Sequence, residues 1–375
     1  MPLVEISPQP RLTRPLAVAL LLAAALSAPA GAQAATTEPA TLARTAAVDD
    51  RAVAPALRID FLGVHWRGKA SAAGAVRFRR TGRWGRWHAL HRGDIRPPGR
   101  FASELVAARR ATAYQVRAPA GARDVRAVAI NTTDGPPRPL VRRSAAGAGA
   151  GQPPAGGPFA PLCLRDRAGW HADESLRFDA AGNEVWPPVF FAVQRLTVHH
   201  TAIEHGGADH AAVVRAIYRY HAVDLGWGDI GYQLLIDDDG CVYEGRSSGA
   251  DGVPVFPGPP QPGAALAVNG GHVFGFNPGN VGVALIGGFT DAAPSRAALR
   301  SLTRTLAVLA VIGGLDPLAT GTYVNPLTGA TLQTATISGH RDWLATECPG
   351  EQLYALLPEI RRRVATLVAG TRPGG

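Results

Sequence analysis

The sequence has little of what membrane proteins and repeat proteins are built from. Beyond residue 34, none of its apolar runs reaches the roughly 20 residues that a membrane-spanning helix needs, so we expect no stable membrane span. No segment recurs at a fixed period, which excludes a repeat array. Lysine is almost absent, since Lys69 is the only lysine among 38 basic residues. The net charge of +9 is therefore carried by arginine.

The N-terminus has the pattern of a cleaved export signal. Two arginines precede an apolar run over residues 16–26, and small residues follow. This run is too short to span a bilayer, and an A-x-A cleavage site ends at Ala34. We therefore predict a signal peptide over residues 1–34, cleaved after Ala34, and a secreted or cell-wall-associated protein. The alternative is an uncleaved membrane anchor.

Composition divides the rest of the chain into four segments. Residues 35–54 are expected to be flexible, and residues 141–160 form a linker of Gly, Pro and Ala with too few apolar residues to fold alone. Between them, residues 55–140 contain short alternating stretches separated by Gly, Pro and Asp, which predict a small β-sandwich-like accessory domain. In residues 161–370, periodicities of two and 3.6 alternate, which predicts an α/β or α+β domain.

Positive charge is concentrated in the β-rich segment. Between residues 55 and 145, 18 arginines and one lysine stand against five acidic residues, whereas residues 146–375 carry five more acidic than basic residues. An Arg-rich surface on an exported protein favours anionic wall polymers or lipid headgroups as partners, and not nucleic acid. A codon bias toward arginine is the alternative explanation. Trp66, Trp84 and Trp87 are either a platform for stacking carbohydrate or core residues.

Three segments of the larger domain carry residues suited to chemistry. They are the HHT segment with His199 and His200, the DIGY segment ending at Tyr232, and the stretch from His340 to Cys348. Strand ends are where α/β sheets place ligands. Two histidines and one cysteine match the three protein ligands of a catalytic zinc site, which keeps a fourth position open for water.

The two adjacent histidines are not equivalent. Neighbouring residues of a strand point to opposite faces of a sheet, so only one of His199 and His200 can face a shared metal. This alternation does not select between them. Taken singly, each histidine and the cysteine are also explained as buried structural side chains.

Taken together, the segments VHHTA, GWxDIGY, VYEGR, GFN and GHRDxxxTxCPG resemble, in this order, the type 2 N-acetylmuramoyl-L-alanine amidases. This family includes the peptidoglycan recognition proteins, and the exported actinobacterial members are the most similar. The resemblance covers about residues 165–368. It implies an α/β fold with a mixed β-sheet flanked by helices, and a zinc ion at the bottom of a substrate groove.

Position by position, the resemblance implies that His199, His340 and Cys348 hold Zn²⁺. Tyr232 matches the catalytic tyrosine, and Thr346 stands where the family has Lys or Thr. Recognition proteins that only bind peptidoglycan usually lack one of the metal ligands, so the resemblance implies an active enzyme. We expect it to be a monomer. It would hydrolyse the amide bond between N-acetylmuramic acid and L-alanine in peptidoglycan. The alternatives are a non-catalytic peptidoglycan-binding protein and a zinc peptidase that shortens stem peptides.

Two cysteines and two segments remain. Cys163 and Cys241 are available for a disulfide, which export makes plausible but which spacing does not establish. Residues 247–270 and 323–334 are longer than the family pattern, and the first is expected to form a loop at the rim of the groove.

Overall fold

The structure is a computed structural model that describes residues 37–68, 74–93, 100–139, 162–203, 209–249 and 253–371. The predicted signal peptide and the predicted linker over residues 141–160 lie outside these ranges. Residues 36–375 form one compact unit. Within the described ranges, no helix combines the length and the apolarity needed to cross a bilayer.

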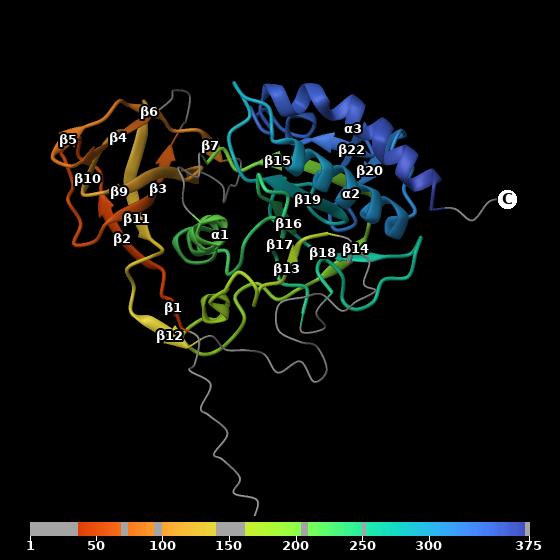
Figure 1. Ribbon diagram of the computed structural model, residues 1–375, viewed down its shortest axis with the longest axis horizontal. Coiled ribbons are helices and arrows are strands. Elements are labelled where there is room, and N and C mark those ends of the chain that lie inside the picture. The colour runs from red at the N-terminus through yellow and green to blue at the C-terminus, as the bar shows by residue number, and fades with distance from the viewer. Residues whose placement is uncertain are drawn as a thin grey trace, which may run out of the picture. The chain divides into compact units, whose positions relative to one another are not determined.

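The N-terminal region is built from two antiparallel sheets that share one core, as the alternating pattern predicts (Figure 1). Ile59 and Leu62 of one sheet pack with Val76, Phe78 and Tyr114 of the other. The first sheet contains β2 (Leu42–Ala47), β3 (Ile59–Gly68), β7 (Arg92–Gly93), β8 (Arg100–Ser103), β9 (Val106–Ala111) and β11 (Ala122–Asn131). The second contains β4 (Ala75–Arg80), β5 (Arg83–Trp84), β6 (His88–Ala89) and β10 (Ala113–Arg117).

The segment expected to be flexible, residues 35–54, contains two strands instead. β2 pairs antiparallel with β11, and β1 (Thr37–Pro39) pairs with β12 (Pro137–Pro139). The sequence of β2 has only weak alternation, so its ladder with β11 holds it in the sheet rather than its own propensity. The division of the chain into domains stays a prediction.

The C-terminal region contains a six-stranded mixed sheet in the order β13-β17-β16-β19-β15-β22. β19 lies inside the sheet, parallel to both of its neighbours, and all six of its residues are buried. The strands β16 and β17 form an antiparallel hairpin. Their bounds are β13 (Leu164–Arg165), β15 (Arg195–His200), β16 (Leu234–Ile236), β17 (Val242–Glu244), β19 (Asn280–Leu285) and β22 (Ile337–Gly339). The mixed sheet confirms the expected fold class.

Three helices flank this sheet, and side chains cap the first two at their N-termini. Asp209 accepts a hydrogen bond from Ala212 N at the start of α1 (His210–Arg219), which continues as a π-helical turn over Tyr220–Asp224. Ser295 caps α2 (Arg296–Gly313), and Gly314 ends it in the left-handed conformation at φ 64°. The last helix is α3 (Glu351–Ala369).

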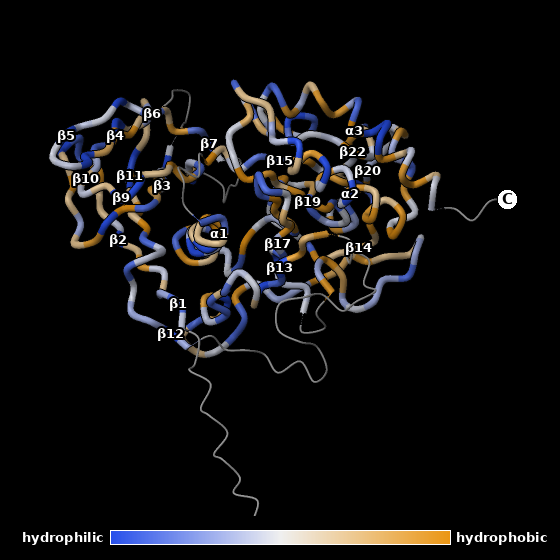
Figure 2. Tube along the Cα trace, in the orientation of Figure 1, coloured by the Kyte–Doolittle hydropathy of each residue, from blue (hydrophilic) through white to orange (hydrophobic). Residues whose placement is uncertain are grey.

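The helices cover opposite faces of the sheet. Leu196, Val198, Val281 and Val283 belong to a buried cluster with α2 and α3, whereas Ala284 belongs to a cluster with α1. In Figure 2, orange and blue stretches alternate along the helices, as expected where one side of a helix packs on the sheet. Side chains of alternate strand residues therefore enter different cores.

Two further strand pairs complete the region. β14 (Phe190–Ala192) pairs with β18 (Leu266–Val268), which lies within the long loop predicted over residues 247–270. β20 (Thr320–Val324) and β21 (Thr331–Ala335) form a hairpin in the insertion predicted over residues 323–334.

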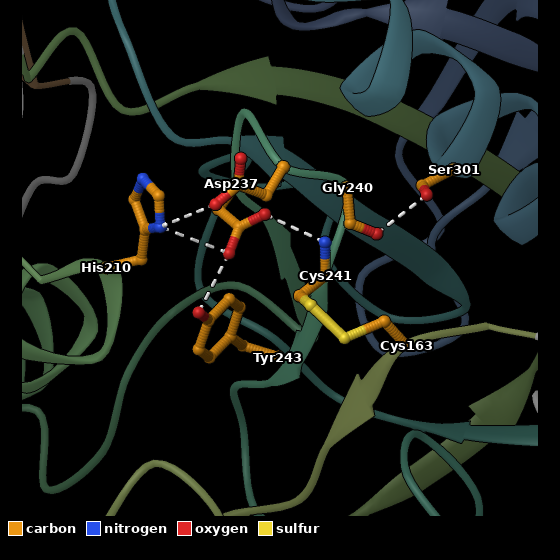
Figure 3. Close-up of a disulfide and its surroundings, with 8 residues drawn as sticks. Cys163, His210, Asp237, Gly240, Cys241, Tyr243 and Ser301 are labelled. Carbon is orange, nitrogen blue, oxygen red and sulfur yellow. Dashed lines mark hydrogen bonds and ion pairs between the residues drawn. A yellow bond between two sulfur atoms is a disulfide. The ribbon is translucent and has the colours of Figure 1, made fainter.

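The disulfide between Cys163 and Cys241 is present, which confirms that pairing (Figure 3). It joins residues 78 positions apart and lies where Val242 N donates to Cys163 O. Next to it, Asp237 accepts hydrogen bonds from Cys241 N and from the Tyr243 hydroxyl, both at 2.8 Å. The bond therefore ties the entry of the C-terminal region to the hairpin.

We expect the double substitution Cys163→Ser and Cys241→Ser to lower the free energy of unfolding by about 2–4 kcal/mol, because this long cross-link restricts the unfolded chain. Urea unfolding followed by circular dichroism measures the change. Reductant should lower the midpoint of the unsubstituted protein and leave that of the double variant where it is. If the unsubstituted protein and the double variant had equal urea midpoints without reductant, the bond would not have this stabilising role.

Candidate metal centre

The parallel pairing of β15 and β22 places two histidines side by side. In this register Val198 pairs with Gly339, so the next residues along the two segments are His199 and His340. Val198 faces the core under α2 and α3. His199 therefore points to the opposite face of the sheet, where its Nδ1 lies 3.1 Å from Nδ1 of His340.

His200 follows His199 on β15, so its side chain points to the opposite face of the sheet and makes different contacts. Its Nδ1 accepts a hydrogen bond from Phe289 N at 3.4 Å. Its backbone N–H donates to Cys348 Sγ at 3.4 Å, which helps to orient the thiol. Tertiary packing thus decides a choice that strand alternation left open, and it brings His199 to the cluster.

Cys348 reaches the same point from the loop between the short helix His340–Asp342 and α3. Its Sγ lies 3.6 Å from His199 Nδ1. Thr346 Oγ1 accepts from Cys348 N at 3.1 Å, and Arg341 N donates to Cys348 O at 3.0 Å. The ligand atoms of His199, His340 and Cys348 all lie within 4.8 Å of one another, and all three residues are buried.

The donor set fits a zinc ion. Burial lowers the pKa of His340 to about 3, and burial with the nearby His340 and His272 lowers the pKa of His199 well below its usual value. Both imidazoles are therefore neutral near pH 7, the form that binds metal. Zinc bonds of about 2.0–2.3 Å in a tetrahedral site put ligand atoms roughly 3.3–3.8 Å apart. The separations of 3.1 and 3.6 Å from His199 Nδ1 are close to this range.

His272 sets the tautomer of His199. Its Nε2 lies 3.0 Å from Asn280 O, a carbonyl that only accepts, so Nε2 carries the proton. Burial lowers the pKa of His272 to about 3, so its Nδ1 is unprotonated and accepts from His199 Nε2 at 3.0 Å. His199 is then left with a lone pair on Nδ1, directed at His340 and Cys348. The role of His272 is not predicted from the sequence, although the histidine in the segment before GFN was the available signal.

Tyr232 and Thr346 line the same cavity as His340 and Cys348, and its volume is about 480 Å³. The Tyr232 ring centroid lies 5.3 Å from that of His199, which is fully buried behind the cavity wall. The structure thus brings all five predicted site residues together.

A buried ion-pair network holds the segment that carries Tyr232. Asp229 is fully buried and bonds to Arg167 at 3.0 Å and to Arg246 at 2.8 Å. Burial acts to raise the pKa of Asp229, but the two guanidinium groups outweigh it and lower that pKa below its usual value. Arg246 N also donates to Tyr232 O at 2.8 Å. The sequence analysis assigned no role to either arginine.

Comparisons with known proteins match the region that contains this cluster. A family model of N-acetylmuramoyl-L-alanine amidases matches residues 190–351. The peptidoglycan-recognition protein SC2 of Drosophila simulans is 30% identical over 161 residues, which cover 42% of this chain and 68% of that protein. The chain belongs to the N-acetylmuramoyl-L-alanine amidase family. Amidases of this family are in general zinc-dependent.

The other relatives in this amidase family differ in length. The human N-acetylmuramoyl-L-alanine amidase is 36% identical over 166 residues, which cover 43% of this chain and 23% of the human protein. The chain thus spans about a quarter of the length of the mammalian amidases it matches. The solved structure of Drosophila PGRP-LB is 25% identical with a TM-score of 0.37, covering 51% of this chain and 90% of that one.

Substituting His272 by Ala should weaken zinc binding about 10–100-fold, because His199 loses the acceptor that selects its tautomer. Competition with a chromophoric chelator measures the affinity. His221→Ala is the matched control, since His221 is also buried and accepts from Gly231 N, but lies outside the cluster. If both variants lost zinc affinity to a similar extent, general destabilisation would explain the effect.

Proposed function

We propose that the protein is a zinc-dependent amidase that hydrolyses the bond between N-acetylmuramic acid and L-alanine in peptidoglycan. The observation that supports this proposal is the cluster of His199, His340 and Cys348, in which His340 and Cys348 line one cavity with Tyr232 and Thr346. Three protein ligands leave a fourth position for water and substrate, which favours catalysis over binding alone. A non-catalytic peptidoglycan-binding protein would have no use for that open position.

The chain's own residues divide the remaining work. When bound, Zn²⁺ would supply a Lewis acid and a water of lowered pKa. We assign Tyr232 as the donor to the carbonyl oxygen of the scissile amide, where negative charge develops. Because Thr346 Oγ1 already accepts from Cys348 N, its hydroxyl proton is directed to the substrate in this scheme. His272 holds the proton on His199 Nε2, away from the reacting side.

We further propose that the mature protein acts outside the cytoplasm as a monomer. The disulfide between Cys163 and Cys241 favours an oxidising compartment. Size-exclusion chromatography of the mature chain tests the monomer.

Mass spectrometry of the products from purified muropeptides tests the reaction. We expect release of intact stem peptide with an N-terminal L-alanine, loss of that release with a zinc chelator, and its return with zinc. Tyr232→Phe should lower kcat about 10²–10³-fold, the usual cost of losing one donor to a developing oxyanion, with zinc affinity unchanged.

Tyr323→Phe is the matched control, since its buried hydroxyl donates to Pro278 O outside the cavity and its loss should leave kcat unchanged. Shortened stem peptides would instead identify a peptidase. Unchanged muropeptides in the presence of bound zinc would identify a binding protein.

A second proposal concerns the partner of the Arg-rich region. The guanidinium groups of Arg77 and Arg117 lie 4.8 and 4.0 Å from the centre of the Trp87 ring, and Arg77 also lies 4.9 Å from that of Trp84. These cations lie over the rings that a sugar would stack on, and Trp66 is buried in the core. We therefore propose that this surface binds anionic wall polymers by charge, in place of the carbohydrate platform.

Binding to purified cell walls should fall steeply as NaCl is raised, because screening weakens contacts between exposed charges. The pair Arg77→Gln and Arg117→Gln should weaken sedimentation with walls at low salt. Arg362→Gln with Arg363→Gln on α3 removes the same charge elsewhere and is the control. Binding that changes neither with NaCl nor with either pair of substitutions would contradict an electrostatic contact.

A further inference from the structure

One loop of the C-terminal region carries two of the candidate site residues, Thr346 and Cys348. Arg341 N, at the start of this loop, donates to Cys348 O at its end, at 3.0 Å. Cys348 is buried, whereas Ala345 and Glu347 are exposed. The middle of the loop therefore lies at the surface, away from the core that holds its end.

Two side chains of the β-rich region contact this exposed part of the loop. The Arg92 guanidinium donates to Ala345 O at 3.2 Å, and His91 Nδ1 lies 3.4 Å from a carboxylate oxygen of Glu347. Ala345 and Glu347 are the two neighbours of Thr346 in the chain. Contacts from a distant part of the chain therefore reach the loop on both sides of Thr346.

Arg92 belongs to a strand that the sheet holds in place. It lies on β7, which pairs antiparallel with β8, so that Arg92 is opposite Ser103. Glu104 N also donates to His91 O at 2.8 Å, which ties the residue before Arg92 to the same sheet. Arg92 and Thr346 line the same cavity at the metal centre. The hydrogen bond from Arg92 to the loop is thus made beside the candidate site.

A buried interface holds the two regions in this arrangement. The Tyr220 hydroxyl donates to Val64 O at 3.3 Å, and its ring lies against Gly63, where an added Cβ would come within 2.4 Å. Phe61 and Ile130 of the β-rich region share a buried cluster with Tyr220. Interiors packed this closely resist displacement, so the fold fixes the distance from β7 to the loop.

The backbone of the loop sets the direction of the Thr346 side chain. Thr346 Oγ1 accepts from Cys348 N at 3.1 Å, which leaves the hydroxyl proton for another acceptor. The Ala345 carbonyl that Arg92 holds belongs to the peptide group that joins Ala345 to Thr346. Fixing this peptide group limits rotation of the backbone next to Thr346. A misplacement of about 1 Å in a group that positions substrate can cost about 10²-fold in rate.

We propose that Arg92 is a positioning residue for the amidase reaction, and that its hydrogen bond to Ala345 O keeps the Thr346 hydroxyl directed at the substrate. This inference rests on the proposed amidase function. It adds a residue that lies outside the range matched by the amidase family model, residues 190–351. Arg92 acts through the loop and contacts no reacting atom. The β-rich region therefore contributes to turnover as well as to the charged surface.

Kinetics with purified muropeptides test the inference. Arg92→Ala should lower kcat about 3–10-fold, the usual effect of losing one hydrogen bond, and leave KM within about twofold. Arg92→Lys keeps a cationic donor and should recover most of the loss. Arg67→Ala removes an arginine of the same sheet that pairs with Asp124 outside the cavity, so it is the matched control and should leave kcat unchanged.

A double substitution separates positioning from general destabilisation. In a Thr346→Val background, Arg92→Ala should lower kcat no further, because its effect passes through the Thr346 hydroxyl. Independent, additive losses would overturn the inference, since they would show that Arg92 acts by another route.

Hydrogen exchange measured by mass spectrometry reports on the loop without turnover. In the zinc-loaded protein, Arg92→Ala should speed the exchange of amides in residues 341–348 about 3–10-fold, whereas Arg67→Ala should not change it. If the unsubstituted protein hydrolysed no muropeptide, the amidase function would fail, but faster exchange would still support the contact between Arg92 and the loop. Exchange that Arg92→Ala leaves unchanged would overturn the inference.

Discussion

The parallel register between β15 and β22 is the constraint on which the site depends. It sets His199 and His340 next to each other on one face of the sheet, within 3.1 Å, at the point where both strands end. Two charged imidazoles would repel each other at this distance, but burial keeps both neutral. The same burial makes lone pairs available, so the packing that closes the core also prepares the ligands.

Around this pair, two networks of buried polar groups hold the site in place. The series from Asn280 O through His272 to His199 fixes the position of each proton. Asp229 with Arg167 and Arg246 plays the corresponding structural role for the Tyr232 segment. Removing one member of such a buried pair commonly costs about 3–5 kcal/mol, because an unpaired charge stays behind. These networks give the site its rigidity, although none of their members touches the substrate in the proposed mechanism.

The β-rich region changes what the amidase core presents to its surroundings. Gly63 allows the Tyr220 ring to approach the backbone of β3, and a larger residue would separate the two regions. With the regions in contact, Trp66 and Leu90 of the β-rich region line the same cavity as His340 and Cys348. The arginines of the outer sheet lie away from this cavity, over the rings of Trp84 and Trp87. The β-rich region thus contributes residues to the cavity beside the candidate metal site and also carries a charged surface.

The sequence by itself determined the local elements and the identity of the candidate ligands. Alternation predicted the β-rich region, mixed periodicities predicted the α/β region, and motif resemblance selected His199, His340, Cys348, Tyr232 and Thr346. Tertiary structure decided what depends on contacts between distant segments. These are the pairing of β2 with β11 in a segment expected to be flexible, the proton arrangement through His272, the pairing of Asp229, and the lining of the cavity by Trp66 and Leu90. The reason is physical: caps and periodicity act over a few neighbouring residues, whereas tautomers, buried charges and cavities are set by groups that meet only in the folded chain.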